Sequence, residues 1–82
     1  MSGGELESGG LQATVAANVR CKRLRLGLSQ EQLADLSGFH RTYIGSVERG
    51  ERNITLSTLE SLAAALETTP TELLQAKDGR IR

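Results

Sequence analysis

The segment from residue 30 to residue 49, QEQLADLSGFHRTYIGSVER, constrains the fold of this 82-residue chain more than any other stretch. Apolar residues recur in it at an i, i+3 spacing, in the pairs Leu33/Leu36 and Ile44/Val47. This spacing places the members of each pair on one face of a helix. Gly38 lies between the pairs, and because it has no Cβ it can take the positive φ of a sharp turn. The segment therefore predicts two short helices joined by a tight turn.

A small residue in the first of these helices completes a recognisable pattern. Ala34 is followed four residues later by the turn glycine, and then by apolar residues six and nine positions further on. That is the spacing of a helix-turn-helix motif. The predicted outward face of the second helix carries hydrogen-bonding or positive groups of little bulk: Arg41, Thr42, Gly45, Ser46 and Arg49. Such a face suits a helix end inserted into a DNA major groove, where Arg pairs with guanine and hydroxyls bond several bases.

The composition predicts one small all-α domain. A chain of this length has room for a small core, and dimerisation would bury further apolar surface. Phe39 and Tyr43 are its only aromatic residues, so the core must consist of Leu, Val, Ile and Ala. Runs of alternating β-branched residues are missing, which favours a helical bundle over a sheet.

The charges of the chain sum to zero, but they are unevenly distributed. Between residues 20 and 52, seven Arg or Lys side chains stand against four Asp or Glu, a local net charge of +3. The positive charge therefore accompanies the two-helix motif, as expected for a DNA-binding surface. A neutral chain binds DNA weakly without sequence preference, so specific contacts and dimerisation would supply more of the affinity.

Several function classes find no support in the sequence. One Cys (Cys21) and one His (His40) cannot form a zinc site, and we predict no metal and no other cofactor. There is no P-loop and no G-x-S-x-G motif, so an enzyme is not predicted. The N-terminus does not read as a signal sequence, and no apolar run approaches about 18 residues. We therefore expect a cytoplasmic protein without a membrane partner.

Start and stop signals divide the chain into a tail, a domain and a second tail. Residues 1–10 are rich in Gly, Ser and Glu and are predicted to be a disordered tail. The DNA-binding domain is predicted over residues 11–76, and residues 77–82 are expected to fray. The first helix should run from residue 11 or 14 to 26, with an inward face formed by Val15, Val19, Arg23 and Leu26, and end at Gly27.

Four further helices are expected. Ser29 and Gln32 form a capping box for a helix over 30–37, and Gly50 stops a helix over 41–49. After a loop at 51–55, Ser57 and Glu60 predict a second capping box that opens a helix to residue 66. Thr69 and Pro70 then open a short helix over 70–75, with Pro at its first position.

This arrangement resembles the Cro/λ-repressor-like (XRE-type) helix-turn-helix family of bacterial and phage transcription regulators, over about residues 15–74. Within that family, the run RTYIGSVERGERNIT at 41–55 looks most like the small controller proteins of restriction–modification systems. The resemblance implies a five-helix all-α bundle that dimerises and binds double-stranded DNA at a two-fold or pseudo-two-fold operator.

The resemblance also implies roles for individual residues. DNA base contacts would come from Arg41, Thr42 and Ser46. DNA backbone contacts would come from Gln30, Tyr43, Arg49, Arg52 and Asn53. A structural salt bridge between the first and third helices would join Arg23 and Glu48. The dimer interface would include Thr69, Pro70, Leu73 and Leu74.

For several of these residues the sequence leaves a second interpretation open. Tyr43 could pack in the core, Gln30 and Asn53 could be capping or turn residues, and Leu73 or Leu74 could belong to the core. Gly45 stands where many members of the family have a side chain that can reach DNA.

The function we predict is a sequence-specific, homodimeric DNA-binding transcriptional regulator, the controller of a restriction–modification system. Two dimers on adjacent sites are compatible with this function, and no small-molecule ligand is predicted. Within the same class, a phage-type repressor or an antitoxin-type autoregulator is the alternative. From a different class, a helix-turn-helix protein-interaction module would show a large exposed apolar patch in place of Arg41, Thr42, Ser46 and Arg49.

Overall fold

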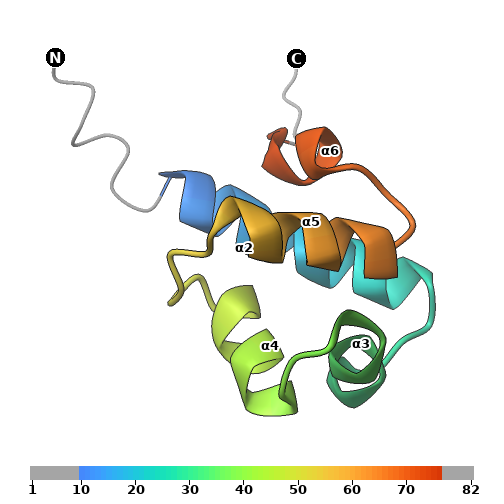
Figure 1. The fold of residues 1–82 in the computed structure, drawn as a ribbon. Coiled ribbons are helices and arrows are strands. Elements are labelled where there is room, and N and C mark those ends of the chain that lie inside the picture. The colour runs from blue at the N-terminus through green and yellow to red at the C-terminus, as the bar shows by residue number, and fades with distance from the viewer. Residues whose placement is uncertain (1–9, 77–82) are drawn as a thin grey trace, which may run out of the picture.

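Five α-helices account for most of residues 10–76, the part of the chain that this computed structural model describes (Figure 1). They are α2 (Gly10–Arg25), α3 (Gln30–Ser37), α4 (Arg41–Glu48), α5 (Leu56–Ala65) and α6 (Pro70–Leu74). Residues 10–76 contain no strand, which confirms the predicted five-helix, all-α fold class over that range. The predicted tails lie outside the described residues, except that Gly10 already belongs to α2.

The helices are arranged around α2 and α5. Helices α3 and α4 contact each other, while α4 also packs on α2 and α3 packs on α5. Helix α6 contacts α2 and α5 and lies on the side opposite to α3 and α4 (Figure 1). The arrangement leaves one flank of the α3–α4 pair free of other helices.

The core is aliphatic, as the composition predicted. Its fully buried large side chains come from all five helices or their ends: Val19, Leu33, Ile44, Leu62, Leu66 and Leu73. Burying a side chain of this size stabilises a fold by about 1.5–3 kcal/mol relative to leaving it exposed. Because Leu33 on α3 and Ile44 on α4 enter the same cluster, the core fixes how the two helices cross.

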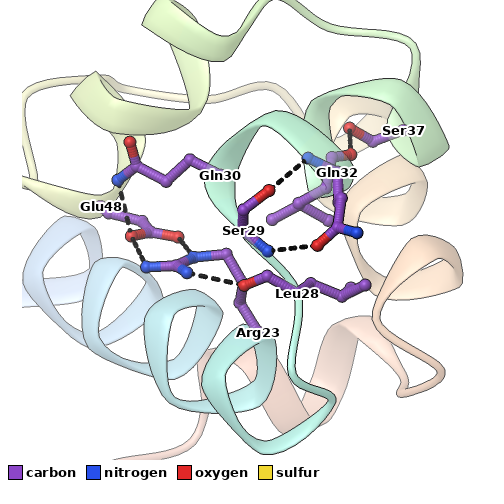
Figure 2. A network of polar contacts seen from close by, with 8 residues as sticks. Arg23, Leu28, Ser29, Gln30, Gln32, Ser37 and Glu48 are labelled. Carbon is purple, nitrogen blue, oxygen red and sulfur yellow. Dashed lines mark hydrogen bonds and ion pairs between the residues drawn. The ribbon is translucent and has the colours of Figure 1, made fainter.

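Local signals set the ends of α3 where the sequence predicts them. Ser29 Oγ accepts a hydrogen bond from the Gln32 N–H at 3.0 Å, and Gln32 Oε1 accepts one from the Ser29 N–H at 2.8 Å, so the predicted capping box is present (Figure 2). Gly38 ends the helix with φ +82° and donates its N–H to the carbonyl of Ala34 at 2.8 Å. A side chain at Gly38 would be strained by that backbone conformation.

Helix α5 begins two residues earlier than predicted. Its cap is Thr55, whose Oγ1 accepts a hydrogen bond from the Thr58 N–H at 3.1 Å, so the predicted capping role of Ser57 is wrong. Ile54, the residue before the cap, is packed against the core, as is Leu59 in the first turns of the helix. An apolar pair in these positions stabilises the chain's entry into a helix, and it favours Thr55 over Ser57.

The end of α2 also corrects one prediction. Leu26 is 40% exposed and does not share the buried face of Val15, Val19 and Arg23, because α2 ends at Arg25. Gly27 turns the chain with φ +72°, and the N–H of Leu28 bonds back to the carbonyl of Arg23 at 3.0 Å. The three remaining differences are small, since α4, α5 and α6 each end one residue before the predicted position.

Candidate nucleic-acid interface

A buried ion pair joins α4 to α2 and so sets the orientation of α4. Arg23 donates from Nε to Glu48 Oε2 at 2.6 Å and from Nη2 to Glu48 Oε1 at 3.0 Å (Figure 2). The side chains are only 10% and 4% exposed. Arg23 also donates from Nη1 to the carbonyl of Leu28 at 2.8 Å, and Gln30 Nε2 donates to Glu48 Oε1 at 3.1 Å. The network therefore links α2, the turn before α3, α3 and α4.

Arg23 is held in its charged form by this contact. The hydrogen bond to Glu48 raises the pKa of Arg23 above its usual value, against the smaller opposing effect of burial. Charge-assisted bidentate pairs of this kind combine strength with a defined geometry. The α4 helix is thus fixed relative to α2 by a directional contact in addition to apolar packing.

The N-terminal end of α4 presents two polar side chains to solvent. Arg41 and Thr42 are both exposed, at the first two positions of the helix. No hydrogen bond or ion pair within residues 10–76 involves either side chain. They are therefore available to an external partner, which the predicted base-contacting role requires.

Two other residues of the predicted outward face are buried. Ser46 is only 6% exposed, and its Oγ donates to the carbonyl of Tyr43 at 2.7 Å and accepts from Arg52 Nε at 3.0 Å. Gly45 lies under other side chains, because a Cβ built there would be 3.2 Å from Arg49 Nη1 and 3.5 Å from Gln30 Oε1. The predicted exposure of both positions is wrong, since side chains from α3, the end of α4 and the following loop cover this part of α4. Ser46 as placed cannot donate to a base without breaking its hydrogen bond to the Tyr43 carbonyl.

The predicted backbone-contacting residues surround this covered part of α4. Tyr43 is half-buried, and its ring centroid lies 5.2 Å from that of Phe39. The Arg52 guanidinium lies 5.2 Å from the centroid of the Tyr43 ring. Tyr43 therefore packs on the core and also borders the surface. Arg52 and Asn53 are exposed in the loop after α4. Gln30 is half-buried at the first position of α3.

An acidic residue for which no role was predicted, Glu51, pairs with one of these arginines. Arg49 donates from Nε to Glu51 Oε2 at 3.0 Å and from Nη2 to Glu51 Oε1 at 3.1 Å, and both side chains are more than half exposed. The hydrogen bond from Arg49 lowers the pKa of Glu51, and the same bond raises the pKa of Arg49. Two residues that are two positions apart in a turn have no fixed relative orientation, so the sequence does not predict this pair. The loop conformation brings the two side chains together.

The four residues predicted for a dimer interface have different environments. Leu73 is fully buried in the core of its own chain, so its predicted place in an interface is wrong. Thr69 caps α6 by accepting from the Glu72 N–H at 3.1 Å, and Pro70 is half-buried at the first position of the helix. Asn18 of α2 holds the end of α6 through bonds to the carbonyls of Leu73 and Gln75, each at 2.8 Å. Leu74 remains 38% exposed.

Leu74 lies at the edge of an apolar hollow. Two further leucines at this hollow are strongly exposed, Leu11 at 63% and Leu56 at 77%. Its lining also includes Val15, Ile54 and Leu59, together with Arg52 and Asn53 of the loop after α4. This surface, formed by α2, the loop before α5, α5 and α6, is one a second apolar surface could cover.

Two further kinds of feature are missing from residues 10–76. No group of three or more His, Cys, Asp or Glu residues is placed there so that it could hold a metal ion. In the same part of the chain, no helix has the length and hydropathy needed to cross a membrane.

The crossed α3–α4 pair, with Arg41 and Thr42 exposed at the start of the second helix, defines a helix-turn-helix DNA-binding protein. The sequence model of the helix-turn-helix family matches residues 20–73, which is more than half of the chain. The chain belongs to this family of DNA-binding transcription regulators.

Transcription regulators and controller proteins are similar to this chain in sequence and in fold. Control protein C.SmaI of Serratia marcescens is 61% identical over 64 residues, which cover 78% of this chain and 76% of that protein. Among solved structures, the restriction-modification controller protein C.AhdI of Aeromonas hydrophila has a TM-score of 0.73 and 47% identity, over 76% of this chain and 94% of that one. The hypothetical transcription factor NHTF from Neisseria has a TM-score of 0.79 and 45% identity, over 82% and 77% of the two chains.

Proposed function

We propose that this chain is the controller of a restriction–modification system and that it acts as a homodimer on a two-fold or pseudo-two-fold operator. Its likeness to control proteins supports the regulatory class. The single observation that carries the proposal is the exposed pair Arg41 and Thr42 at the start of a helix that a buried ion pair orients.

In this proposal, base recognition comes from the N-terminal end of α4. Arg41 would pair with guanine through two hydrogen bonds, a contact worth about 1–3 kcal/mol of discrimination against another base. Thr42 can donate, accept or place its methyl group against thymine. Ser46, assigned to this set on sequence grounds, is not retained because its hydroxyl is already bonded within the protein.

The phosphate backbone would be bound on both sides of α4. Arg49, Arg52 and Asn53 are exposed at its C-terminal side, and Gln30 stands at the N-terminus of α3, where backbone N–H groups favour an anion. Tyr43 is half-buried, and its position beside Arg52 leaves it at the border of this surface. These contacts would set the register of the protein on the duplex without reading sequence.

A second copy would cover the apolar hollow. Leu11, Leu56 and Leu74 are exposed there together, on three different helices. Leu74 is retained from the predicted interface, whereas Leu73 is replaced by Leu56 and Leu11. In a dimer, the two α4 helices would enter successive major grooves about 34 Å apart, one helical turn.

The mode of regulation follows from binding position and concentration. One or two dimers bound at adjacent sites would activate or repress transcription according to their place relative to a promoter. In a controller-type system, accumulation of the dimer would delay the restriction enzyme until the methyltransferase had acted.

Selection of bound sequences from random DNA tests this function. We expect enriched sites with two half-sites related by two-fold symmetry, with centres about 10 base pairs apart. Enrichment of a single unpaired half-site would contradict dimeric binding. Failure to enrich any sequence would contradict the DNA-binding proposal and favour a protein-interaction module.

A further inference from the structure

Ser46, Tyr43 and Arg52 form a small cluster over the covered part of α4, here called the Arg52 clamp. The Ser46 hydroxyl donates to the backbone carbonyl of Tyr43 at 2.7 Å and accepts from Arg52 Nε at 3.0 Å. The Arg52 guanidinium lies 5.2 Å from the centroid of the Tyr43 ring. An arginine from the loop after α4 is thus held by two contacts from the helix itself.

The direction of these hydrogen bonds follows from the chemistry of a hydroxyl. A serine side chain has one O–H donor and two acceptor lone pairs. Because the single donor is used on the Tyr43 carbonyl, only acceptor capacity remains, which matches the N–H of Arg52 Nε. The hydroxyl would have to reorient and lose a bond before it could donate to a base.

The clamp occupies only one of the five N–H donors of the guanidinium. The four N–H groups on Nη1 and Nη2 make no hydrogen bond within the described residues, and the Arg52 side chain is exposed. A planar guanidinium over an aromatic ring is further oriented by cation–π attraction. An arginine held in this way before DNA arrives loses less rotamer freedom on binding than a free one.

We infer that Ser46 is a positioning residue, which reads no base and instead holds Arg52 against Tyr43 with its Nη groups available to DNA. The inference rests on the proposed DNA-binding function. It assigns to Ser46 a role different from that of Arg41 and Thr42, although all three are on α4. It also makes the affinity contribution of Arg52 dependent on a hydroxyl six residues earlier.

The first test uses the free protein, so that it does not depend on DNA. In Ser46→Ala, hydrogen exchange at Arg52 Nε, followed by NMR, should become faster, while exchange at Arg41 Nε stays unchanged. Circular dichroism should show the fold retained, because the change only removes an oxygen from a small side chain. An unchanged exchange rate at Arg52 Nε in Ser46→Ala would overturn the inference.

The second test is a double-mutant cycle on a duplex carrying a site from the random-DNA selection. Ser46→Ala should weaken binding by about fivefold, the effect of one ordinary hydrogen bond. In an Arg52→Ala background the same change should have no further effect. An equal loss in both backgrounds would show that Ser46 contacts DNA on its own and would overturn the positioning role.

Arg52→Lys provides the matched control, since it keeps the positive charge but lacks Nε–H. Binding by Arg52→Lys should be insensitive to Ser46→Ala, and a fivefold loss there would contradict the clamp. Wild-type affinity in Arg52→Ala would overturn the inference while leaving the proposed function intact. No binding by the wild-type chain to any duplex would instead overturn the proposed function.

Discussion

Arg23 on α2 and Glu48 on α4 form a bidentate ion pair whose Nε–Oε2 and Nη2–Oε1 distances are 2.6 and 3.0 Å. The pair is nearly enclosed, and it makes further hydrogen bonds to the Leu28 carbonyl and the Gln30 amide. The pair therefore connects α2 to the last turn of α4, the helix proposed to enter DNA.

Loss of one partner of this pair should be strongly destabilising. Glu48→Ala would leave the Arg23 charge buried without compensation, and we expect a loss of about 3–5 kcal/mol in the free energy of unfolding. Urea denaturation followed by circular dichroism measures it. The matched control is Glu51→Ala, which breaks the exposed pair with Arg49 and should barely move the midpoint. Similar midpoints for the two variants would show that burial does not distinguish the pairs.

Arg41→Ala should reduce the preference for the selected site. We expect the affinity for that site to fall by roughly 10- to 100-fold, which corresponds to about 1–3 kcal/mol, with affinity for unrelated DNA nearly unchanged. Fluorescence anisotropy with both duplexes at one salt concentration measures the two affinities. Equal losses on both DNAs would assign Arg41 to the phosphate backbone.

Glu51→Gln should strengthen binding to all DNA sequences. The carboxylate of Glu51 competes with phosphate for Arg49, so its neutralisation should raise affinity by up to about fivefold. The logarithmic dependence of affinity on salt should steepen by about one unit if Arg49 gains a phosphate contact. Glu60→Gln on α5 removes the same charge from an exposed position. An equal gain in that control would attribute the effect to net charge alone.

The same pair predicts a pH dependence whose sign follows from the lowered pKa of Glu51. The pair is fully present above the ordinary carboxyl pKa and is lost as pH falls through the lowered value, where Glu51 becomes protonated. The difference in DNA affinity between wild type and Glu51→Gln should therefore disappear as the pH falls through that range. Anisotropy titrations at a series of pH values measure it, and a difference that persists at low pH would exclude the Glu51 carboxylate as its source.

Leu56→Glu should convert the proposed dimer to a monomer. Leu56 is 77% exposed at the apolar hollow, so the change should not affect folding, but it would place a charge in the interface. Sedimentation velocity across a range of concentrations measures the change in association. Leu36→Glu is the matched control, because Leu36 is 62% exposed on α3 and does not line that hollow. Dissociation by Leu36→Glu alone would move the proposed interface to the α3 side.

The sequence by itself determined the features that depend on neighbours three or four residues away. Ser29 with Gln32, Gly38 and Thr69 each act through hydrogen bonds or backbone conformation within one helical turn, and the structure has them where the local pattern predicts. The inward positions of Leu33, Ile44 and Val47 likewise follow from helical periodicity.

Only the tertiary structure decided which surface positions stay exposed. Ser46 is buried because Arg52 folds back over it, and Leu73, rather than Leu74, faces the core because of how α6 packs on α2. The choice of Thr55 over Ser57 as a cap depended on the burial of Ile54. Helical periodicity predicts which residues share a face of a helix. Whether that face is exposed depends on side chains from other elements, and their positions cannot be predicted from the local sequence pattern.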